Sequence, residues 1–374
     1  MRFHDDLNEL QRQTLETIIA GETPSRFELS NLFGVSPQTM TRAVKGLVEN
    51  GILDEQPETT GTRGQPSRRL VFRTGSLLVI GLVLANHRLI VTVEDLAGNR
   101  LLKDELAGDF SDPQSTLDKA ADLITKAVQT FDGIQRIVGL GIAAQGFFIE
   151  KGRRVVSFAN LKGWSEIDLK AYFGDKFNVP VTIQNDAKAI AVGTIREGLA
   201  RRHKYYFCFY LGSGVGGALV HDGQLYEGAF SNAGEIGYFV PRNEHRPTVP
   251  NFLRVANIKA VDEWKDDMKQ DQRILDWCRT AGESLSAAAQ VAVRSYDVES
   301  IFICSYMPRS ALQAICDAVR VEPIGSDLLS SVDAAQLPQR PSIIPLNDTS
   351  LNKGACALAA YHFLRFSSLG GSGG

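Results

Sequence analysis

The 374-residue sequence has few of the features that mark secreted, membrane or metal-binding proteins. Its five cysteines never come within ten residues of one another, so they form no CxxC motif and indicate no disulfide framework. No apolar run approaches the roughly 18 residues that a membrane span needs, and no charged-then-apolar leader opens the chain. We therefore expect a cytoplasmic protein with no membrane partner, whose cysteines are buried as small apolar side chains.

Strong charge of either sign is also lacking, since the formal net charge is −3. This value does not decide for or against nucleic-acid binding, because the distribution of charge along the chain matters more than its sum. The length and the hydrophobic content of 44% suit two or three packed domains.

Residues 1–75 have the pattern of a winged helix-turn-helix. Apolar residues recur at helical spacing up to Gly21, which predicts a first helix. Ser25 and Ser36 are placed to cap two further helices, with Gly34 in the sharp turn between them. Met40, Val44, Leu47 and Val48 form the expected buried stripe of the third helix. The side chains predicted to contact DNA from this helix and its cap are Ser36, Gln38, Thr39, Thr41, Arg42 and Lys45.

A basic wing follows the third helix. Two short apolar segments near Leu53 and Leu70 read as strands, with a tip rich in glycine and proline between them. From Thr59 to Thr74 the chain carries four arginines and no acidic residue. A single surface arginine is usually only solvated, but four beside a helix-turn-helix favour double-stranded operator DNA as partner. The wing residues predicted to contact DNA are Arg63, Gln65, Arg68 and Arg69.

A glycine-rich stretch, Leu211–Tyr238, contains the densest functional signal. A strand over 205–211 leads into Gly212, Gly214, Gly216 and Gly217, which we expect to leave backbone N–H groups open to an oxygen-rich ligand. The dipeptide Asp222-Gly223 predicts a tight hairpin. Such a stretch alone is weak evidence, since glycine loops after strands are more often hairpins or bulges.

Three upstream segments add weight to it. They are GLGIAAQG ending at Gly146, FANLKGW ending at Trp164, and VTIQNDAKA ending at Ala189. In the last of these, Asn185 and Asp186 follow a buried strand, at the end where open α/β sheets place ligands.

Together the four segments resemble the ROK family of sugar kinases and sugar-responsive repressors, over about residues 76–366. The resemblance implies an α/β fold in which the winged helix-turn-helix precedes a two-lobed, actin-like (ribonuclease H-like) ATPase-fold sugar kinase domain. The expected parts are a DNA-binding domain (1–75), a first lobe (76–185, completed by about 345–366), a second lobe (186–344) and a flexible tail (367–374). The wing segment GQPSRRL is similar to that of ROK repressors, whereas ROK kinases generally lack the whole extension.

The resemblance also implies a sugar site. The implied contacts are Gly146, Asn160, Asn185, Asp186, Glu235, Tyr238 at the family's histidine position, and Arg254 near its last sugar-contacting glutamate. Asp186 matches the general base of the kinases. An arginine in place of that glutamate favours an acidic or phosphorylated sugar. The structural alternative is that these residues only form an Asx turn and glycine bends.

Several positions depart from the ROK kinases. Val83 stands where they have the magnesium-binding aspartate, residues 85–88 replace their phosphate loop, and Cys304-Ser305 replace a glycine pair. A valine cannot hold a metal ion, so we expect neither ATP binding nor catalytic residues. The family's zinc histidine and cysteines are missing around residues 238–255, so we expect no zinc and no other cofactor.

We therefore predict a transcriptional regulator, a repressor rather than an enzyme, that binds a sugar effector and acts as a homodimer or homotetramer. The competing interpretation is an active ATP-dependent sugar kinase with an appended DNA-binding domain. A third is a scaffold that recruits a partner protein and binds no sugar.

Overall fold

The computed structural model describes residues 7–57, 68–85, 87–131, 136–150, 154–156, 163–199, 202–322, 339–347 and 351–365. The chain divides into two compact units, Met1–Ala144 with Ser157–Ile183 and Ala355–Gly374, and Gln145–Val156 with Gln184–Gly354. Within the described ranges, no helix combines the length and apolar character that crossing a membrane requires.

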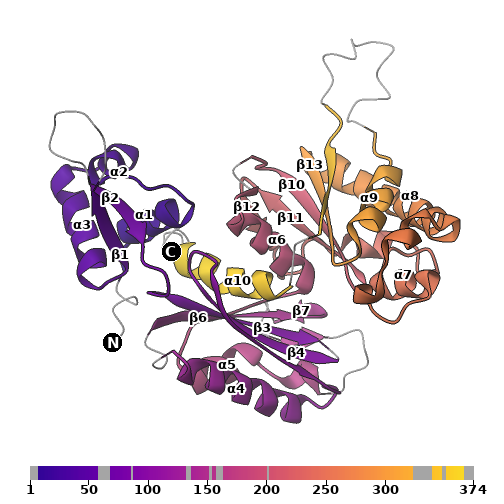
Figure 1. Ribbon diagram of the computed structural model, residues 1–374, viewed down its shortest axis with the longest axis horizontal. Helices are drawn as coiled ribbons and strands as arrows, with labels where there is room; N and C mark the ends of the chain where they lie inside the picture. The colour runs from indigo at the N-terminus through magenta and orange to yellow at the C-terminus, as the bar shows by residue number, and fades with distance from the viewer. Residues whose placement is uncertain are drawn as a thin grey trace. The chain divides into compact units, whose positions relative to one another are not determined.

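The first unit opens with the predicted winged helix-turn-helix (Figure 1). Its elements are α1 (Glu9–Ile19), α2 (Arg26–Leu32), α3 (Pro37–Glu49) and the antiparallel strands β1 (Leu53–Pro57) and β2 (Arg68–Phe72). Ser25 and Ser36 cap α2 and α3 as predicted, since their hydroxyls accept the backbone N–H of Glu28 and Thr39. The turn between the two helices passes through Gly34 at φ +64°. The three helices predicted from the sequence are thus confirmed.

A five-stranded sheet of order β5-β4-β3-β6-β9 forms the body of the first unit. Its strands are β3 (Leu78–Ala85), β4 (Arg88–Asp95), β5 (Arg100–Ala107), β6 (Ile137–Ala144) and β9 (Val181–Gln184). Figure 1 shows α4 (Pro113–Gln129) and α5 (Leu169–Phe177) on one face and α10 (Leu351–Arg365) on the other; η3 (Trp164–Glu166) precedes α5. Helix α10 packs directly on the strands, because a Cβ on Gly81 would lie 2.7 Å from the backbone nitrogen of Cys356.

The winged helix-turn-helix shares its hydrophobic core with this sheet and with α10. Leu15, Met40 and Leu70 belong to the same buried cluster as Val79 and Phe363. The Arg12 guanidinium donates to the Phe363 carbonyl and lies 4.6 Å from the centroid of its ring. The predicted domain boundary at residue 75 therefore does not coincide with a break between compact units.

The second unit contains a sheet of the same design, ordered β12-β11-β10-β13-β14. Its strands are β10 (Tyr206–Leu211), β11 (Val215–His221), β12 (Gln224–Tyr226), β13 (Ser300–Ser305) and β14 (Ser342–Leu346), and β7 (Phe147–Ile149) pairs separately with β8 (Arg154–Val156). The helices are α6 (Asp186–Arg196), η5 (Ile236–Phe239), α7 (Val249–Ala256), η6 (Val261–Glu263), η7 (Asp266–Gln270), α8 (Gln272–Tyr296) and α9 (Arg309–Ala318). Helix α6 and helices α7–α9 pack into separate hydrophobic clusters of this unit.

The two sheets repeat one topology. In each, the first three strands form an antiparallel meander, and the fourth strand pairs parallel to the first. A duplicated α/β unit of this kind is what the two-lobed expectation requires.

Candidate functional site

Asn185 joins the start of α6 to the glycine-rich stretch. As the N-cap residue of α6, it accepts the backbone N–H of Lys188 at 2.9 Å through Oδ1. Its Nδ2 donates to the Glu235 carboxylate at 3.1 Å, and its side chain is buried. The structure thus brings together two residues, 50 positions apart in the chain, that the sequence assigned to one site.

Asp186, the first residue of α6, completes this group. Its Oδ1 accepts the backbone N–H of Ala187 at 2.9 Å. Burial raises the pKa of Asp186 to about 6, and the nearby charge of Glu235 contributes in the same direction. Burial also raises the pKa of Glu235 above its usual value, against the opposing effects of Lys188 and Asn185. Two desolvated carboxylates beside an amide can accept hydrogen bonds from the hydroxyls of a polyol.

The glycines of the stretch act differently from the prediction. Gly216 and Gly217 lie inside β11, in the ladder with β10, and the N–H of Gly212 donates to the Gly214 carbonyl at 3.0 Å. The expectation of an open backbone N–H is therefore wrong for Gly212. Gly216 and Gly217 lie in a strand and not in the expected loop.

Close approach of backbones explains the glycines instead. A Cβ on Gly216 would lie 2.9 Å from Cβ of Ala187 and 3.7 Å from Oδ1 of Asp186. A Cβ on Gly234, which has φ +95°, would lie 2.5 Å from the Gly217 carbonyl oxygen. The missing side chains allow β11 to pack against the start of α6 and against the turn that carries Glu235.

A second polar layer, which the sequence analysis missed, lies beside this group. The Lys188 side chain is fully buried, and its ammonium donates to the carbonyls of Glu227 at 3.3 Å and Ser231 at 2.7 Å. Gln184 donates through Nε2 to the Glu227 carboxylate at 3.1 Å. Burial lowers the pKa of Lys188 to about 8, while Glu227 and Glu235 oppose that shift. The one signal in the sequence was a lysine within an otherwise apolar, alanine-rich helix.

The segment after β6 is fixed on the same unit. Gly146 adopts φ +133° directly before β7, and the Gln145 amide donates to the Ser213 hydroxyl. Asn232 pairs with the Phe148 backbone in both directions, at 2.8 and 2.7 Å. Gly146 thus lies in a segment that the 227–235 stretch holds in place.

Three further predicted sugar contacts are less closely tied to the group. Tyr238 follows Glu235 in η5 and is exposed, with the Arg242 guanidinium 5.5 Å from its ring centroid. Arg254 is exposed on α7, and its guanidinium donates to Asn251 of the same helix at 3.4 Å. Asn160 lies outside the described residues.

The loop at the family's zinc position is held by an arginine. Arg246 donates to the carbonyls of Gly237, at 3.0 Å, Val240 and Pro241. Trp277 adds a bond from Nε1 to the Glu244 carbonyl at 2.8 Å. Over the described ranges, no three His, Cys, Asp or Glu side chains are grouped so that they could hold a metal ion.

The positions that the sequence analysis predicts to differ from the kinases are buried within strands or bonded to the backbone. Val83 is buried in β3, paired with Ile90 on one side and Ala143 on the other. Cys304 is buried in β13, and the Ser305 hydroxyl donates to the Leu211 carbonyl at 2.7 Å. All five cysteines are buried and free, as predicted.

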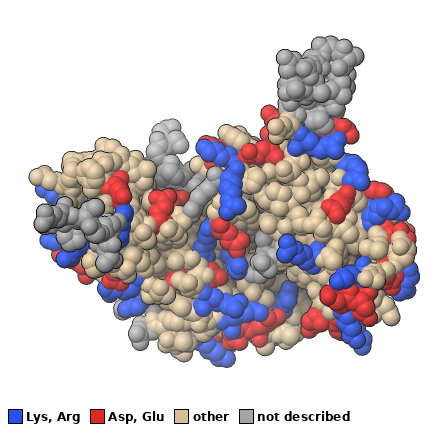
Figure 2. All heavy atoms as spheres, turned by 45° about the horizontal axis from the view of Figure 1, so that its top comes forward, with Lys and Arg blue, Asp and Glu red and all other residues tan. Residues whose placement is uncertain are grey.

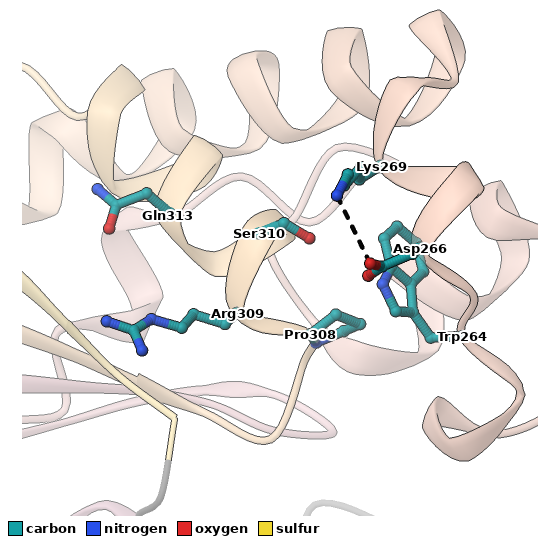
Figure 3. A pocket seen from close by; sticks show the side chains of 7 residues that line it. All are labelled: Trp264, Asp266, Lys269, Pro308, Arg309, Ser310 and Gln313. Atoms are coloured by element: carbon teal, nitrogen blue, oxygen red, sulfur yellow. Dashed lines mark ion pairs between the residues drawn. The ribbon is translucent and has the colours of Figure 1, made fainter.

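A separate cavity of about 560 Å³ lies between η7 and the start of α9. Figure 3 shows its lining residues, with an ion pair of 3.6 Å between Lys269 and Asp266. The lining consists of Trp264, Asp266, Lys269, Pro308, Arg309, Ser310 and Gln313, and so includes none of the predicted sugar contacts.

The predicted DNA-contacting side chains of α3 face solvent. Ser36, Gln38, Thr39, Thr41, Arg42 and Lys45 are all exposed. Ser36 and Thr39 bond each other at 2.9 Å, and Lys45 pairs with Glu49 at 3.5 Å. The buried stripe differs slightly from the prediction, because Ala43 is buried and Val48 is only half-buried.

The basic residues of the wing are partly paired within the protein. Arg68 pairs with Glu55 at 3.5 Å, and Arg69 pairs with Glu28 at 2.5 Å. Arg63 and Gln65 lie outside the described residues. On the face drawn in Figure 2, Lys and Arg are interspersed with Asp and Glu, so that no single basic surface covers it.

Two sheets of repeated topology and a carboxylate-amide group (Asn185, Asp186 and Glu235) at the start of α6 define a duplicated α/β body that follows a winged helix-turn-helix. Residues 79–251 match the sequence model of the ROK family.

Individual relatives agree with this assignment. The chain is 28% identical to the xylose repressor of Bacillus spizizenii over 61% of its own length and 59% of that protein. It is 31% identical to the glucokinase of Streptomyces coelicolor over 43% of its length and 49% of that enzyme. The chain thus spans less than two thirds of either relative.

A solved ROK family transcriptional regulator, a homolog of the E. coli MLC protein, has the same fold. It matches with a TM-score of 0.67 at 16% identity, covering 96% of this chain and 97% of that one. The match extends over the winged helix-turn-helix and both sheets, which confirms the predicted fold class.

Proposed function

We propose that this protein is a DNA-binding transcriptional repressor whose ROK domain binds a sugar effector without phosphorylating it. The observation that carries the proposal is the combination of an exposed recognition helix with a retained carboxylate-amide group. A xylose repressor is among the relatives to which this chain is similar, which makes a neutral pentose a reasonable first candidate effector.

The carboxylate-amide group is suited to hydroxyl recognition. Asn185 fixes the Glu235 carboxylate, and Asp186 lies beside them at the N-terminus of α6. Their remaining acceptor oxygens can each bind a hydroxyl, and leaving such buried groups unmatched costs about 1–3 kcal/mol. Discrimination between sugars would therefore come from which hydroxyls these acceptors meet.

The acidic character of this group favours a neutral sugar. Three carboxylates, Asp186, Glu227 and Glu235, are balanced by the single ammonium of Lys188. An acidic or phosphorylated effector would need Arg254 to approach the bound sugar, and Arg254 lies on the exposed face of α7. We retain Gly146, Asn160, Tyr238 and Arg254 as proposed outer contacts of the effector.

The absence of kinase activity is inferred from the position of Val83. Phosphoryl transfer depends on cations that neutralise the transferred group, and a buried valine in a paired strand offers them no ligand. Asp186 would then serve as a hydroxyl acceptor only. ATP-dependent sugar phosphorylation remains the competing function, since a glucokinase is among the relatives.

DNA binding would place α3 in the major groove and the wing on the adjacent backbone. Arg42 and Gln38 are the proposed base-reading side chains, and Arg63, Gln65, Arg68 and Arg69 the proposed backbone contacts. A symmetric operator would require two copies of α3 about 34 Å apart, so we propose a homodimer or a dimer of dimers.

Two assays on the full chain decide between repressor and kinase. Mobility shift with the DNA upstream of its own gene should show a complex that a sugar from a neutral panel, beginning with D-xylose, weakens or strengthens. A coupled assay with MgATP and the same panel should show no turnover. ATP turnover by the wild type that is lost in Asp186→Ala would show that the protein is a sugar kinase and not a repressor without kinase activity.

A further inference from the structure

Lys188 has an unusual environment for a lysine. Its side chain is fully buried in α6, where the other buried residues are alanine, isoleucine, valine and threonine. Burying an ammonium is unfavourable unless charges and hydrogen bonds compensate for its lost hydration. An apolar residue would fill the same space in the helix at a lower cost in folding free energy. The buried charge is therefore expected to have a function.

The bonds of the ammonium hold one turn of the chain at both ends. Nζ donates to the Glu227 carbonyl at 3.3 Å and to the Ser231 carbonyl at 2.7 Å. Between them the backbone passes through Gly228 at φ +76°, and Ser231 itself adopts φ +61°. A positive φ is unfavourable for a residue other than glycine, so the bond to its carbonyl helps to maintain this conformation.

The same turn leads into the carboxylate-amide group. Asn232 bonds the backbone of Phe148, two residues after Gly146, and Glu235 accepts from Asn185 at 3.1 Å. The segment 227–235 is thus attached to the β9–α6 junction at its start through Gln184 and Lys188, and at its end through Asn185.

We propose that Lys188 is a positioning residue of the effector site: its buried ammonium fixes the segment 227–235 on α6 and balances the carboxylate of Glu235. This inference rests on the proposed function of that site as a sugar site. It adds a residue that does not itself touch the sugar.

The charges around Lys188 define a readout that packing alone would not change. The carboxylates of Glu227 and Glu235 face the ammonium, and Asp186 lies on its own helix. The positive charge of Lys188 lowers the pKa of Glu235, against the effect of burial. Without that charge the Glu235 carboxylate protonates at higher pH, and the pH below which sugar affinity falls rises with it.

The test uses the full chain and the variant Lys188→Met, which keeps the length of the side chain but removes its donors and its charge. The sugar probe is whichever of D-xylose, D-glucose, N-acetyl-D-glucosamine and myo-inositol most raises the melting temperature of the wild type. Calorimetric Kd values are measured from pH 5 to 8. The control is Lys204→Met, because Lys204 is exposed and pairs only loosely with Asp222, at 3.7 Å.

We expect Lys188→Met to bind the probe at least tenfold more weakly at pH 7.5 and to lose affinity at a higher pH than the wild type. The control should match the wild type in both. Lys188→Gln keeps a neutral donor and is the second variant if Lys188→Met does not fold. The pH below which its sugar affinity falls should rise in the same way. The proposal would be overturned if Lys188→Met bound the probe as tightly as the wild type, or bound it more weakly but lost affinity at the same pH as the wild type.

Hydrogen exchange without sugar separates this proposal from the function on which it rests. Backbone amides of residues 227–235 should exchange faster in Lys188→Met than in the wild type, while α8 and the strands of the sheet remain unchanged. If none of the four probes binds the wild type, the sugar site itself is refuted. Unchanged exchange of 227–235 would refute the role of Lys188 even if a probe binds.

Discussion

The two regions that the family resemblance relates to the nucleotide and sugar sites of a kinase have very different chemistry. Around Val83, the strand is buried and apolar, and Ala85 pairs with Arg88 of β4. Around Asn185, by contrast, two carboxylates and an ammonium remain in desolvated surroundings.

The energetic costs of the two regions differ accordingly. A buried valine contributes favourably to folding by about 1.5–3 kcal/mol, whereas buried carboxylates reduce stability unless a ligand or partner matches them. A region without function would be expected to have apolar residues in place of such groups. The retained carboxylates therefore point to a ligand that binds there.

Restoring a carboxylate at position 83 tests the apolar side of the comparison. Val83→Asp should lower the free energy of unfolding by about 3–5 kcal/mol, because the strand offers the new charge no partner. Urea or thermal denaturation measures the loss. Val83→Thr, which has the same shape but adds only a hydroxyl, should cost about 1–3 kcal/mol. A Val83→Asp protein that is as stable as the wild type and binds MgATP would break the comparison.

Removing a charge from the retained group should have opposite effects on stability and on binding. Asp186→Asn should raise the free energy of unfolding at pH 7–8 by up to about 3 kcal/mol, since the folded-state pKa of about 6 exceeds the usual 3.8. The same variant should weaken sugar binding by about 1–3 kcal/mol, or 5- to 150-fold. Denaturation and calorimetry on one preparation measure both. A destabilised variant with unchanged sugar affinity would contradict this account.

The pH dependence follows from the raised pKa of Asp186. Between about pH 4 and 6 the folded protein holds a proton on Asp186 that the unfolded chain has released. Folding therefore takes up a proton within this window, so the contribution of Asp186 to stability falls as pH rises from about 4 to about 6. The wild type should therefore lose stability relative to Asp186→Asn from pH 4 to 6 and remain parallel to it above. Melting curves at half-unit intervals measure the difference.

The loop beside the retained group offers a smaller test. Arg246→Met removes the guanidinium bonds to three backbone carbonyls and should cost about 1–2 kcal/mol of stability. Because the sequence predicts no zinc site and these bonds hold the loop, EDTA should leave the melting temperature of the wild type unchanged. If EDTA lowered the melting temperature and added zinc restored it, a metal ion would be holding this loop.

The smallest expected effect concerns the glycine that faces Asp186. In Gly216→Ala the new Cβ would meet Cβ of Ala187 at 2.9 Å, so β11 or α6 must shift by a few tenths of an ångström. We expect a loss of about 1 kcal/mol in stability, with a larger fractional loss in sugar affinity because Asp186 moves. The control Gly214→Ala, which meets nothing within 4 Å, should behave as the wild type.

Local signals made the winged helix-turn-helix predictable. Serine caps, a glycine at positive φ and helical spacing act over a few residues, and α2 and α3 begin where these signals placed them. Asn185, Asp186 and Glu235 were assigned to one site through the family resemblance, and Nδ2 of Asn185 bonds the Glu235 carboxylate in the structure. The hairpin at Asp222-Gly223 forms as predicted, with φ of +49° and +70°.

Features that depend on distant contacts could not be predicted in the same way. Strand β5 is exposed along most of its length and lacks the alternation that marks a strand in a sequence. Arg12 bonds the carbonyl of Phe363, 351 residues later, so no local pattern indicated that α10 supports the winged helix-turn-helix. The role of Lys188 likewise depends on carbonyls about 40 residues away.

The most direct test of the account is fluorescence anisotropy of labelled upstream DNA, titrated with the wild type and with Asp186→Asn, in the presence and absence of the best-binding neutral sugar. We predict that the sugar changes the DNA affinity of the wild type by 5- to 150-fold, the range of typical allosteric coupling. The variant should bind the DNA but need a roughly 5- to 150-fold higher sugar concentration for the same response. Equal responses in the two proteins, or no DNA binding by either, would contradict the claim that Asp186 belongs to the effector site of a repressor.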